Sequence, residues 1–253
     1  DIDELRINRL GEMGDITGQL DICTTASKIA ETALNDPDRA FAWARRGYFI
    51  ARAQQLDFEQ GLGRLRKLAE THKLWAALLE VTERELEKQT FADEFELVDR
   101  LVDAAEIAEH RLGDPKRAVG YLQRALRESP DDDEIARKVQ TIAEGHELWD
   151  ASLWLGEHRL SQADSPLGRF DAFCAIARIH ERKLGDPKAA FASLRRAWKE
   201  LTPQDSGLAE EALDLGIALA EKHQLWRELA DHHASLARAK ADQGQRLEAI
   251  VAD

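Results

Sequence analysis

The chain has few of the residues that staple small exported proteins or that break helices. Its 253 residues include two cysteines, Cys23 and Cys174, at nearly matching places in two copies of the repeat described below. Such places lie far apart in a repeat array, so we expect no disulfide, and free thiols point to a reducing compartment. With only 6 prolines and 15 glycines but 43% hydrophobic residues, the composition argues against disorder and favours a helix-rich protein.

Long apolar runs and clusters of basic residues are also missing. No stretch approaches the roughly 20 apolar residues of a membrane span, and Asp1–Leu5 lacks the basic and apolar parts of a secretion signal. The net charge of −13, from 35 basic and 48 acidic residues, would on average repel nucleic acid and anionic membranes. We therefore expect a cytoplasmic protein with no nucleic-acid partner and no membrane insertion.

What the chain does contain is two short phrases that recur in step. The first holds an Asp-Pro pair, and its prolines lie 78 and 72 residues apart, at Pro37, Pro115 and Pro187. The second runs from a histidine to a Leu-Trp pair, and its tryptophans lie 74 and 77 residues apart, at Trp75, Trp149 and Trp226. Unrelated phrases with a common spacing indicate a repeated structural unit of about 75 residues.

Each period has room for four helices, because helix pairs of repeat arrays take roughly 34–40 residues. In the second period, apolar residues at three-to-four spacing predict a first helix over 96–112. Gly113 would close that helix in a left-handed conformation, Asp114 would cap the next one, and Pro115 suits its first turn. The tryptophans open the fourth helices, and we interpret them as packing wedges between layers.

The periods extend over approximately 15–90, 91–163 and 164–241, with partial helices at 5–13 and 246–251. Because both ends cut through the pattern without polar capping repeats, we expect 1–253 to be one all-α solenoid of antiparallel helix pairs, with about 13–14 helices, taken from a longer array.

The second helices resemble a known family. Ala118, Leu122, Ala125 and Pro130 match the second half of the tetratricopeptide repeat, and Ala190, Leu194 and Ala197 repeat that pattern. The family's aromatic and glycine positions in the first helix are not met. The chain is most similar to long, divergent tetratricopeptide arrays of bacterial proteins, and faintly to half-a-TPR repeats of RNA-processing scaffolds. The resemblance implies a right-handed superhelix that binds a protein or peptide along a concave groove.

No residue pattern predicts catalysis, a metal site or a cofactor. His72, His146 and His223 recur in register, one layer apart, and each suits the negative end of a helix. His232 and His233 are adjacent and point about 100° apart on a helix, so they cannot chelate one metal together. Gly61 to Gly63 lacks the strand and the Lys-Ser or Lys-Thr of a phosphate loop. We therefore predict that the chain is not an enzyme.

A polar stripe runs along the first helix of each period, opposite the buried face. It comprises Asp21, Thr25, Lys28 and Thr32, then Asp99, Asp103, Glu106 and His110, then Asp171, Ala175, Arg178 and Arg182. By the resemblance this stripe faces the groove, so we predict that all of it except Thr32 and Ala175 binds a partner. A merely solvated helix face is the alternative that the sequence leaves open. The Lys and Asn pattern that clamps a C-terminal carboxylate in some tetratricopeptide domains is absent.

These observations favour a non-catalytic scaffold that binds a protein or peptide partner and belongs to a larger chain or assembly. One alternative is a substrate-presenting or regulatory helical domain of a larger enzyme or signalling protein. A scaffold for RNA processing is a further alternative, which the acidic balance disfavours.

Overall fold

The computed structural model describes residues 2–88, 91, 93–202 and 204–235, and within these ranges the regular structure is helical throughout. The all-α prediction is confirmed. The helices are α1 (Ile2–Glu12), α2 (Ile16–Thr32), α3 (Pro37–Ala53), α4 (Glu59–His72), α5 (Trp75–Lys88), α6 (Glu94–Glu106), the π-helical η1 (Ile107–Arg111), α7 (Pro115–Glu128), α8 (Asp133–Gly145), α9 (Trp149–Gln162), α10 (Pro166–Arg182), α11 (Pro187–Leu201) and α12 (Ser206–Lys222). Residues 226–235 are helical as well. None of the described helices has the length and apolarity to cross a bilayer.

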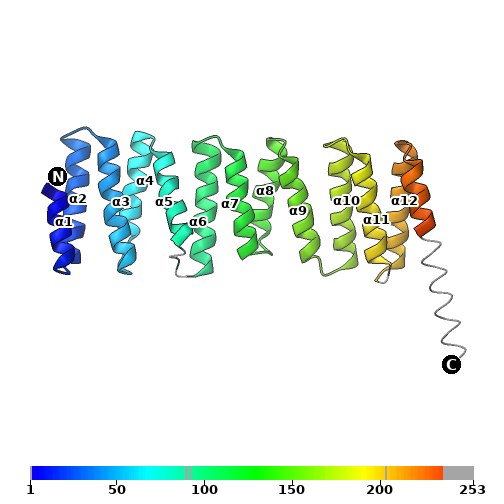
Figure 1. Ribbon diagram of the computed structural model, residues 1–253, viewed down its shortest axis with the longest axis horizontal. Coiled ribbons are helices and arrows are strands. Elements are labelled where there is room, and N and C mark those ends of the chain that lie inside the picture. Colours follow the sequence, from blue (N-terminus) through cyan, green and yellow to red (C-terminus); the bar gives the residue numbers. More distant parts are fainter. Residues whose placement is uncertain (1, 89–90, 92, 203, 236–253) are drawn as a thin grey trace, which may run out of the picture. The chain divides into compact units, whose positions relative to one another are not determined.

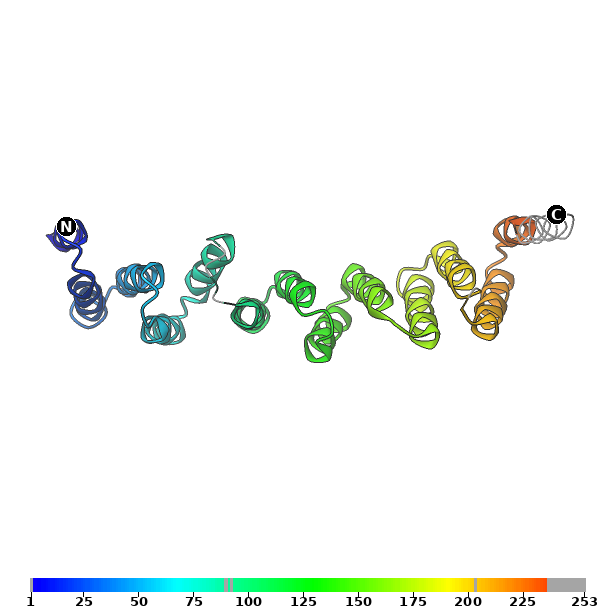
Figure 2. The ribbon, with the colours of Figure 1, turned by 90° about the horizontal axis from the view of Figure 1, so that it is seen from below.

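The chain divides into two compact units, 1–129 and 130–253. Consecutive helices within each unit pack against each other and run antiparallel (Figure 1). Alternate helices of a unit lie in two rows (Figure 2), with α2, α4 and α6 in one row of the first unit and α8, α10 and α12 in one row of the second. The division falls inside the second predicted period, and the organisation of 1–253 as a single array stays a proposal.

The three Asp-Pro junctions close one helix and start the next in the same way. The residue before each aspartate has a positive φ, of 52° at Asn35, 65° at Gly113 and 63° at Gly185. Each aspartate accepts a 3.0 Å hydrogen bond from the backbone N–H three residues later, as Asp114 does from Arg117. The predicted left-handed closure, aspartate cap and first-turn proline are therefore confirmed.

The helix predicted over 96–112 is α-helical only as far as Glu106. Its last turn is the π-helix η1, in which Leu112 donates its N–H to the carbonyl of Ile107 at 3.1 Å. Leu34 and Leu184 donate to Ile29 and Ile179 in the same way, at 3.1 Å each, so one wide turn precedes all three Asp-Pro junctions. The apolar spacing alone did not predict this turn.

The histidine-to-tryptophan phrases form a second recurring junction. In each phrase the residue after the histidine has a positive φ although it is not glycine: 59° at Lys73, 55° at Glu147 and 57° at Gln224. The following leucine N–H bonds the carbonyl of an alanine five residues earlier, at 2.8–3.0 Å. This closure costs roughly 1 kcal/mol more for such residues than for glycine.

Alanine and leucine faces form the core of both units. In the first unit Ala40, Leu65, Leu68 and Ala69 are essentially inaccessible, and Trp75 packs against them. Trp226, which we had interpreted as the equivalent wedge, is 58% exposed. The wedge interpretation therefore holds for Trp75 and is wrong for Trp226.

Candidate functional site

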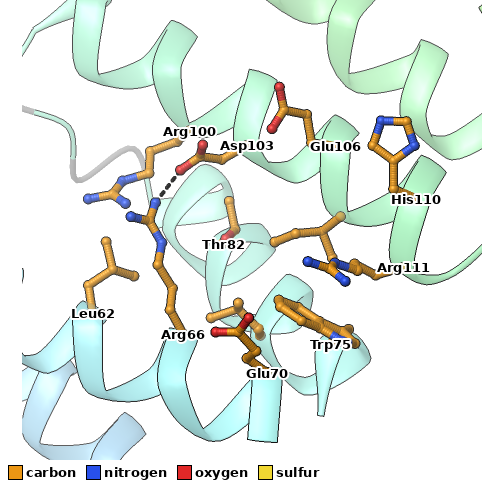
Figure 3. A pocket seen from close by; sticks show the side chains of 12 residues that line it. Leu62, Arg66, Glu70, Trp75, Thr82, Arg100, Asp103, Glu106, His110 and Arg111 are labelled. Atoms are coloured by element: carbon orange, nitrogen blue, oxygen red, sulfur yellow. Dashed lines mark hydrogen bonds and ion pairs between the residues drawn. The ribbon is translucent and has the colours of Figure 1, made fainter. Parts of the chain in front are cut away.

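A cavity of ≈ 380 Å³ lies between α4, α5, α6 and η1 of the first unit, and we name it the first cleft (Figure 3). Its lining is apolar at the base and charged at the rim: Leu62, Arg66, Glu70, Trp75, Leu78, Thr82, Arg100, Asp103, Glu106, Ile107, His110 and Arg111. Three arginines and three carboxylates therefore face the same space and balance each other.

Two of the arginines in the first cleft contact other residues of its lining. Arg66 on α4 forms an ion pair with Asp103 on α6, which spans the cleft in Figure 3. Arg111 stacks on Trp75, with its guanidinium carbon 4.6 Å from the ring centre, a contact that attracts a cation to the ring face. The first cleft is thus crossed and partly closed by its own side chains.

The second cleft is a cavity of ≈ 670 Å³ between α8, α9 and α10. Its described lining is Gln140, Glu144, Trp149, Ser152, Leu155, Gly156, Arg159, Ala172, Ala175, Arg178, Ile179, Arg182 and Lys183. Most of these residues stand one repeat after a residue of the first cleft. Trp149 corresponds to Trp75, and Lys183 lies 4.7 Å from the Trp149 ring centre as Arg111 does from Trp75. The two clefts are therefore built in the same way from equivalent residues of consecutive repeats.

Smaller side chains explain why the second cleft is larger. Ser152 stands where the first cleft has Leu78, Ala172 stands where it has Arg100, and Ala175 replaces Asp103. The ion pair that crosses the first cleft has no counterpart, because Gln140 replaces Arg66 and Ala175 carries no charge.

The two clefts also differ in charge. The described lining of the second cleft holds four basic residues, namely Arg159, Arg178, Arg182 and Lys183, and one acidic residue, Glu144. Arg159 donates a 3.1 Å hydrogen bond to Gln140, and Gln140 donates one of 2.9 Å to Glu144. The excess of positive charge lies in a chain whose net charge is −13.

The clefts contain half of the residues predicted to bind a partner. Asp103, Glu106 and His110 line the first cleft, and Arg178 and Arg182 line the second. Asp99 and Asp171, one turn earlier on their helices, are exposed and do not contribute to either lining. In α2, Asp21 and Thr25 are exposed, while Lys28 lines a separate cavity of ≈ 240 Å³ between α2, α3 and α4. Their role in binding stays a prediction.

Sequence reasoning missed the opposite wall of each cleft. That wall comes from the third and fourth helices of the preceding period, through Arg66 and Trp75 in one case and Trp149 and Arg159 in the other. The recurrence of Trp75 and Trp149 was the available signal, but it was interpreted as packing alone.

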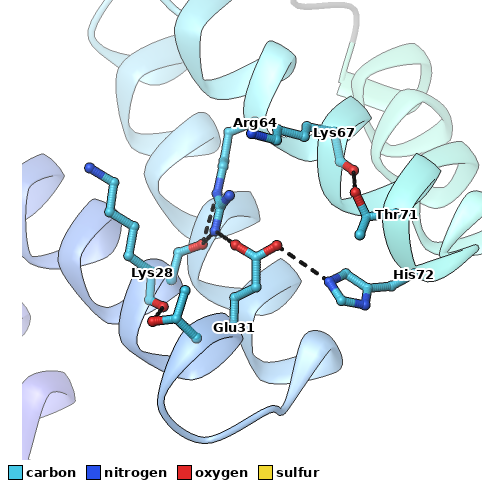
Figure 4. A network of polar contacts seen from close by, with 8 residues as sticks. Lys28, Glu31, Arg64, Lys67, Thr71 and His72 are labelled. Atoms are coloured by element: carbon cyan, nitrogen blue, oxygen red, sulfur yellow. Dashed lines mark hydrogen bonds and ion pairs between the residues drawn. The ribbon is translucent and has the colours of Figure 1, made fainter.

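Two of the three recurring histidines, His72 and His223, each lie beside a glutamate of another helix. His72 lies 3.3 Å from Glu31, which also accepts a 2.6 Å hydrogen bond from Arg64 (Figure 4). The hydrogen bond from Arg64, with help from His72, lowers the pKa of Glu31 below its usual value.

The same arrangement recurs in the second unit. His223 lies 3.0 Å from Glu181, which also accepts a 2.7 Å hydrogen bond from Lys222. The hydrogen bond from Lys222, followed by that from His223, lowers the pKa of Glu181. A glutamate of the first helix thus holds the end of the third helix in both places. His146 is exposed.

A buried polar cluster joins α3, α5 and α6. The Tyr48 hydroxyl donates to Glu85, and Arg52 lies 3.2 Å from Glu85 and 2.6 Å from Glu96. Burial raises the pKa of Glu85 despite these partners. Arg52 also stacks on Phe58, with its guanidinium carbon 4.1 Å from the ring centre, so this arginine links α3 to residues on both sides of it.

Within the described part of the chain, no group of three or more His, Cys, Asp or Glu side chains is placed to hold a metal ion.

His232 is buried, and both of its ring nitrogens are without a hydrogen-bond partner among the described residues. Its ring packs edge-on against Phe191 and Trp198, at 6.0 and 5.3 Å between centres.

No family model and no curated protein matches this sequence. Among solved structures, the chain is similar to one described as the TPR2AB-domain:pHSP90-complex of yeast Sti1, with 14% identity and a TM-score of 0.33 over 86% of this chain and 97% of that one. A likeness at this level says nothing about partners. The all-helical array of antiparallel pairs agrees with the tetratricopeptide resemblance of the sequence.

Proposed function

We propose that the chain is a non-catalytic scaffold that binds extended segments of a protein partner in its two clefts. The observation that carries this proposal is the repetition itself. Each cleft combines a tryptophan, a stacked cation and a variable set of rim residues at equivalent positions. Repeat proteins bind partners in this manner, on a constant frame whose surface residues change from repeat to repeat.

The sizes of the clefts fit this use. Cavities of about 300–1,000 Å³ are typical of binding sites that enclose ligand groups, and both clefts fall in that range. Each has an apolar base, such as Leu155 and Trp149 in the second, below a charged rim. A base of this kind favours burial of an apolar side chain, while the rim sets which neighbouring charges are accepted.

A selection from a random peptide library displayed on phage tests the proposal. Ala175, half-buried in the second cleft, is replaced by Trp to fill it, and Ala192, an exposed residue of α11 outside the cleft lining, is replaced by Trp as the matched control. We expect the wild type and Ala192→Trp to enrich related peptides that Ala175→Trp no longer binds.

Circular dichroism and thermal unfolding establish first that both variants fold like the wild type. Enrichment that is absent from the wild type, or that Ala175→Trp retains in full, contradicts binding in the clefts.

A further inference from the structure

We propose that the second cleft binds an acidic peptide segment, in which several carboxylates flank one apolar side chain. This inference rests on the proposed function and adds the chemistry of the ligand. It starts from the difference between two clefts that are otherwise built alike.

The arginines at the rim of the second cleft are available for a ligand. Arg178 and Arg182 are exposed and stand i, i+4 on α10, so both lie on the same side of that helix. No acidic residue in the described ranges forms an ion pair with Arg178. Arg182 has only a 3.9 Å contact with Glu181, whose carboxylate already binds Lys222 and His223.

Packing does not require these arginines. The first cleft has Glu106 and His110 at the equivalent positions and still forms the same helix arrangement. Positive charge at the second cleft is therefore a property of its surface and not of the fold. Long exposed side chains of one sign, held near each other, raise the local concentration of ligands of opposite sign.

The remaining cations of the cleft are held in place before any ligand arrives. Arg159 bonds to Gln140 at 3.1 Å, and Lys183 stacks on Trp149 at 4.7 Å. Ordered side chains lose little entropy when they bind, which favours affinity. The basic residues come from α9, from α10 and from Lys183 directly after α10, so they are spread along the rim. That spread suits a chain with spaced carboxylates better than one compact anion.

The base of the cleft calls for an apolar group in the ligand. Trp149, Leu155 and Ile179 line it, and the small residues Ser152 and Ala175 replace the larger Leu78 and Asp103 of the first cleft. An apolar side chain placed there would be removed from water while its acidic neighbours meet the arginines. A nucleic acid carries a charge on every nucleotide and would meet the overall charge of −13 beyond the cleft, whereas a short peptide need only contact the cleft itself.

The experiment is a titration, by fluorescence anisotropy, of a labelled peptide with several Glu residues around one Leu in a Gly and Ser background. The same peptide with Lys in place of Glu is the comparison ligand. We expect the Glu peptide to bind, to weaken as salt is added, and to lose at least about tenfold in affinity in the double variant Arg178→Glu, Arg182→Glu. The neutral pair Arg178→Gln, Arg182→Gln should give an intermediate loss.

The matched control is Arg195→Glu with Lys199→Glu, two exposed basic residues of α11 outside the cleft lining, which changes the net charge by the same amount. This control should lower the affinity only slightly. Equal losses in both reversed variants, or binding of the Lys peptide as tight as that of the Glu peptide, would overturn the inference. Preference for a single-stranded oligonucleotide over the Glu peptide would do the same.

The outcome separates the two proposals. Library peptides that depend on the open cleft but show no excess of Asp and Glu would sustain the scaffold function and reject the acidic ligand.

Discussion

The first and second clefts are built from equivalent helices, and each has a tryptophan with a cation stacked on it, yet the two clefts differ in volume and charge. The difference is concentrated at a few equivalent positions. At the base, the pair Thr82 and Ala104 in the first unit becomes Gly156 and Ile176 in the second, so one side chain grows where the other shrinks. At the rim, both members of the Arg66–Asp103 ion pair are replaced by uncharged residues, and Arg178 stands in place of Glu106. Base positions thus keep the frame, whereas rim positions differ in charge.

The largest predicted effect comes from disturbing the exchanged pair. A Cβ atom on Gly156 would lie 2.7 Å from Cγ1 of Ile176, so Gly156→Thr should destabilise the fold by about 2–3 kcal/mol. Ile176→Ala alone should cost about 2–4 kcal/mol through the cavity that it leaves. The double variant restores the combination found in the first unit and should be more stable than either single variant. Urea unfolding of all four proteins measures the coupling, and simple additivity would show that the two positions are independent.

A smaller effect is expected where a third copy departs from the first two. Val81 and Leu155 are buried apolar residues at equivalent places, whereas the next copy has the buried His232. Burial, followed by the nearby charges of His233 and Arg195, lowers the pKa of His232. Since the unfolded chain then binds the proton more readily, stability should fall as the pH drops below about 6.5, the usual value for histidine.

His232→Leu tests this by restoring the apolar residue of the second copy. It should raise the unfolding free energy by about 1 kcal/mol or more near neutral pH, because it removes a buried imidazole that has no hydrogen-bond partner among the described residues. The stability gained by the substitution should be larger at about pH 5.5. At that pH the unfolded wild type protonates this histidine while the fold disfavours its charged form, and the variant has no such cost. Urea unfolding at both pH values gives the answer, and a gain that does not change with pH would contradict it.

The smallest effects should distinguish the two kinds of helix closure. A Cβ on Gly113 would meet nothing within 4 Å, so Gly113→Ala isolates the strain of its φ of 65° and should cost about 1 kcal/mol. Glu147 adopts a φ of 55° without being glycine, and Glu147→Gly should stabilise by about 0.5 kcal/mol after the entropy cost of glycine is counted. Thermal unfolding of the two variants should therefore shift in opposite directions, and shifts of the same sign would contradict the shared conformation.

The sequence predicted those parts of the fold whose chemistry is local. Asp114 caps and Pro115 opens a helix through contacts with their own neighbours, so the phrase itself specified the junction. The left-handed Glu147 was not predicted, because its residue type gives no preference for that conformation and the surrounding helices impose it.

The candidate site was half predicted for the same reason. The helical period placed Arg178 and Arg182 on an exposed stripe, and both are exposed. The wall opposite them, with Trp149 and Arg159, belongs to another helix, and only tertiary packing shows which helix that is. Asp103 illustrates the limit, since its pairing with Arg66 depends on a contact between α4 and α6 that the one-dimensional pattern does not contain.

Transfer of the rim from one cleft to the other tests the account most directly. The triple variant Ala175→Asp, Arg178→Glu, Arg182→His gives the α10 side of the second rim the residues at the equivalent positions of the first, Asp103, Glu106 and His110, and leaves the base intact. We predict that this variant folds as stably as the wild type within about 1 kcal/mol and no longer prefers the Glu peptide over the Lys peptide in competition anisotropy. A variant that folds but keeps the wild-type preference would show that the rim does not select the ligand.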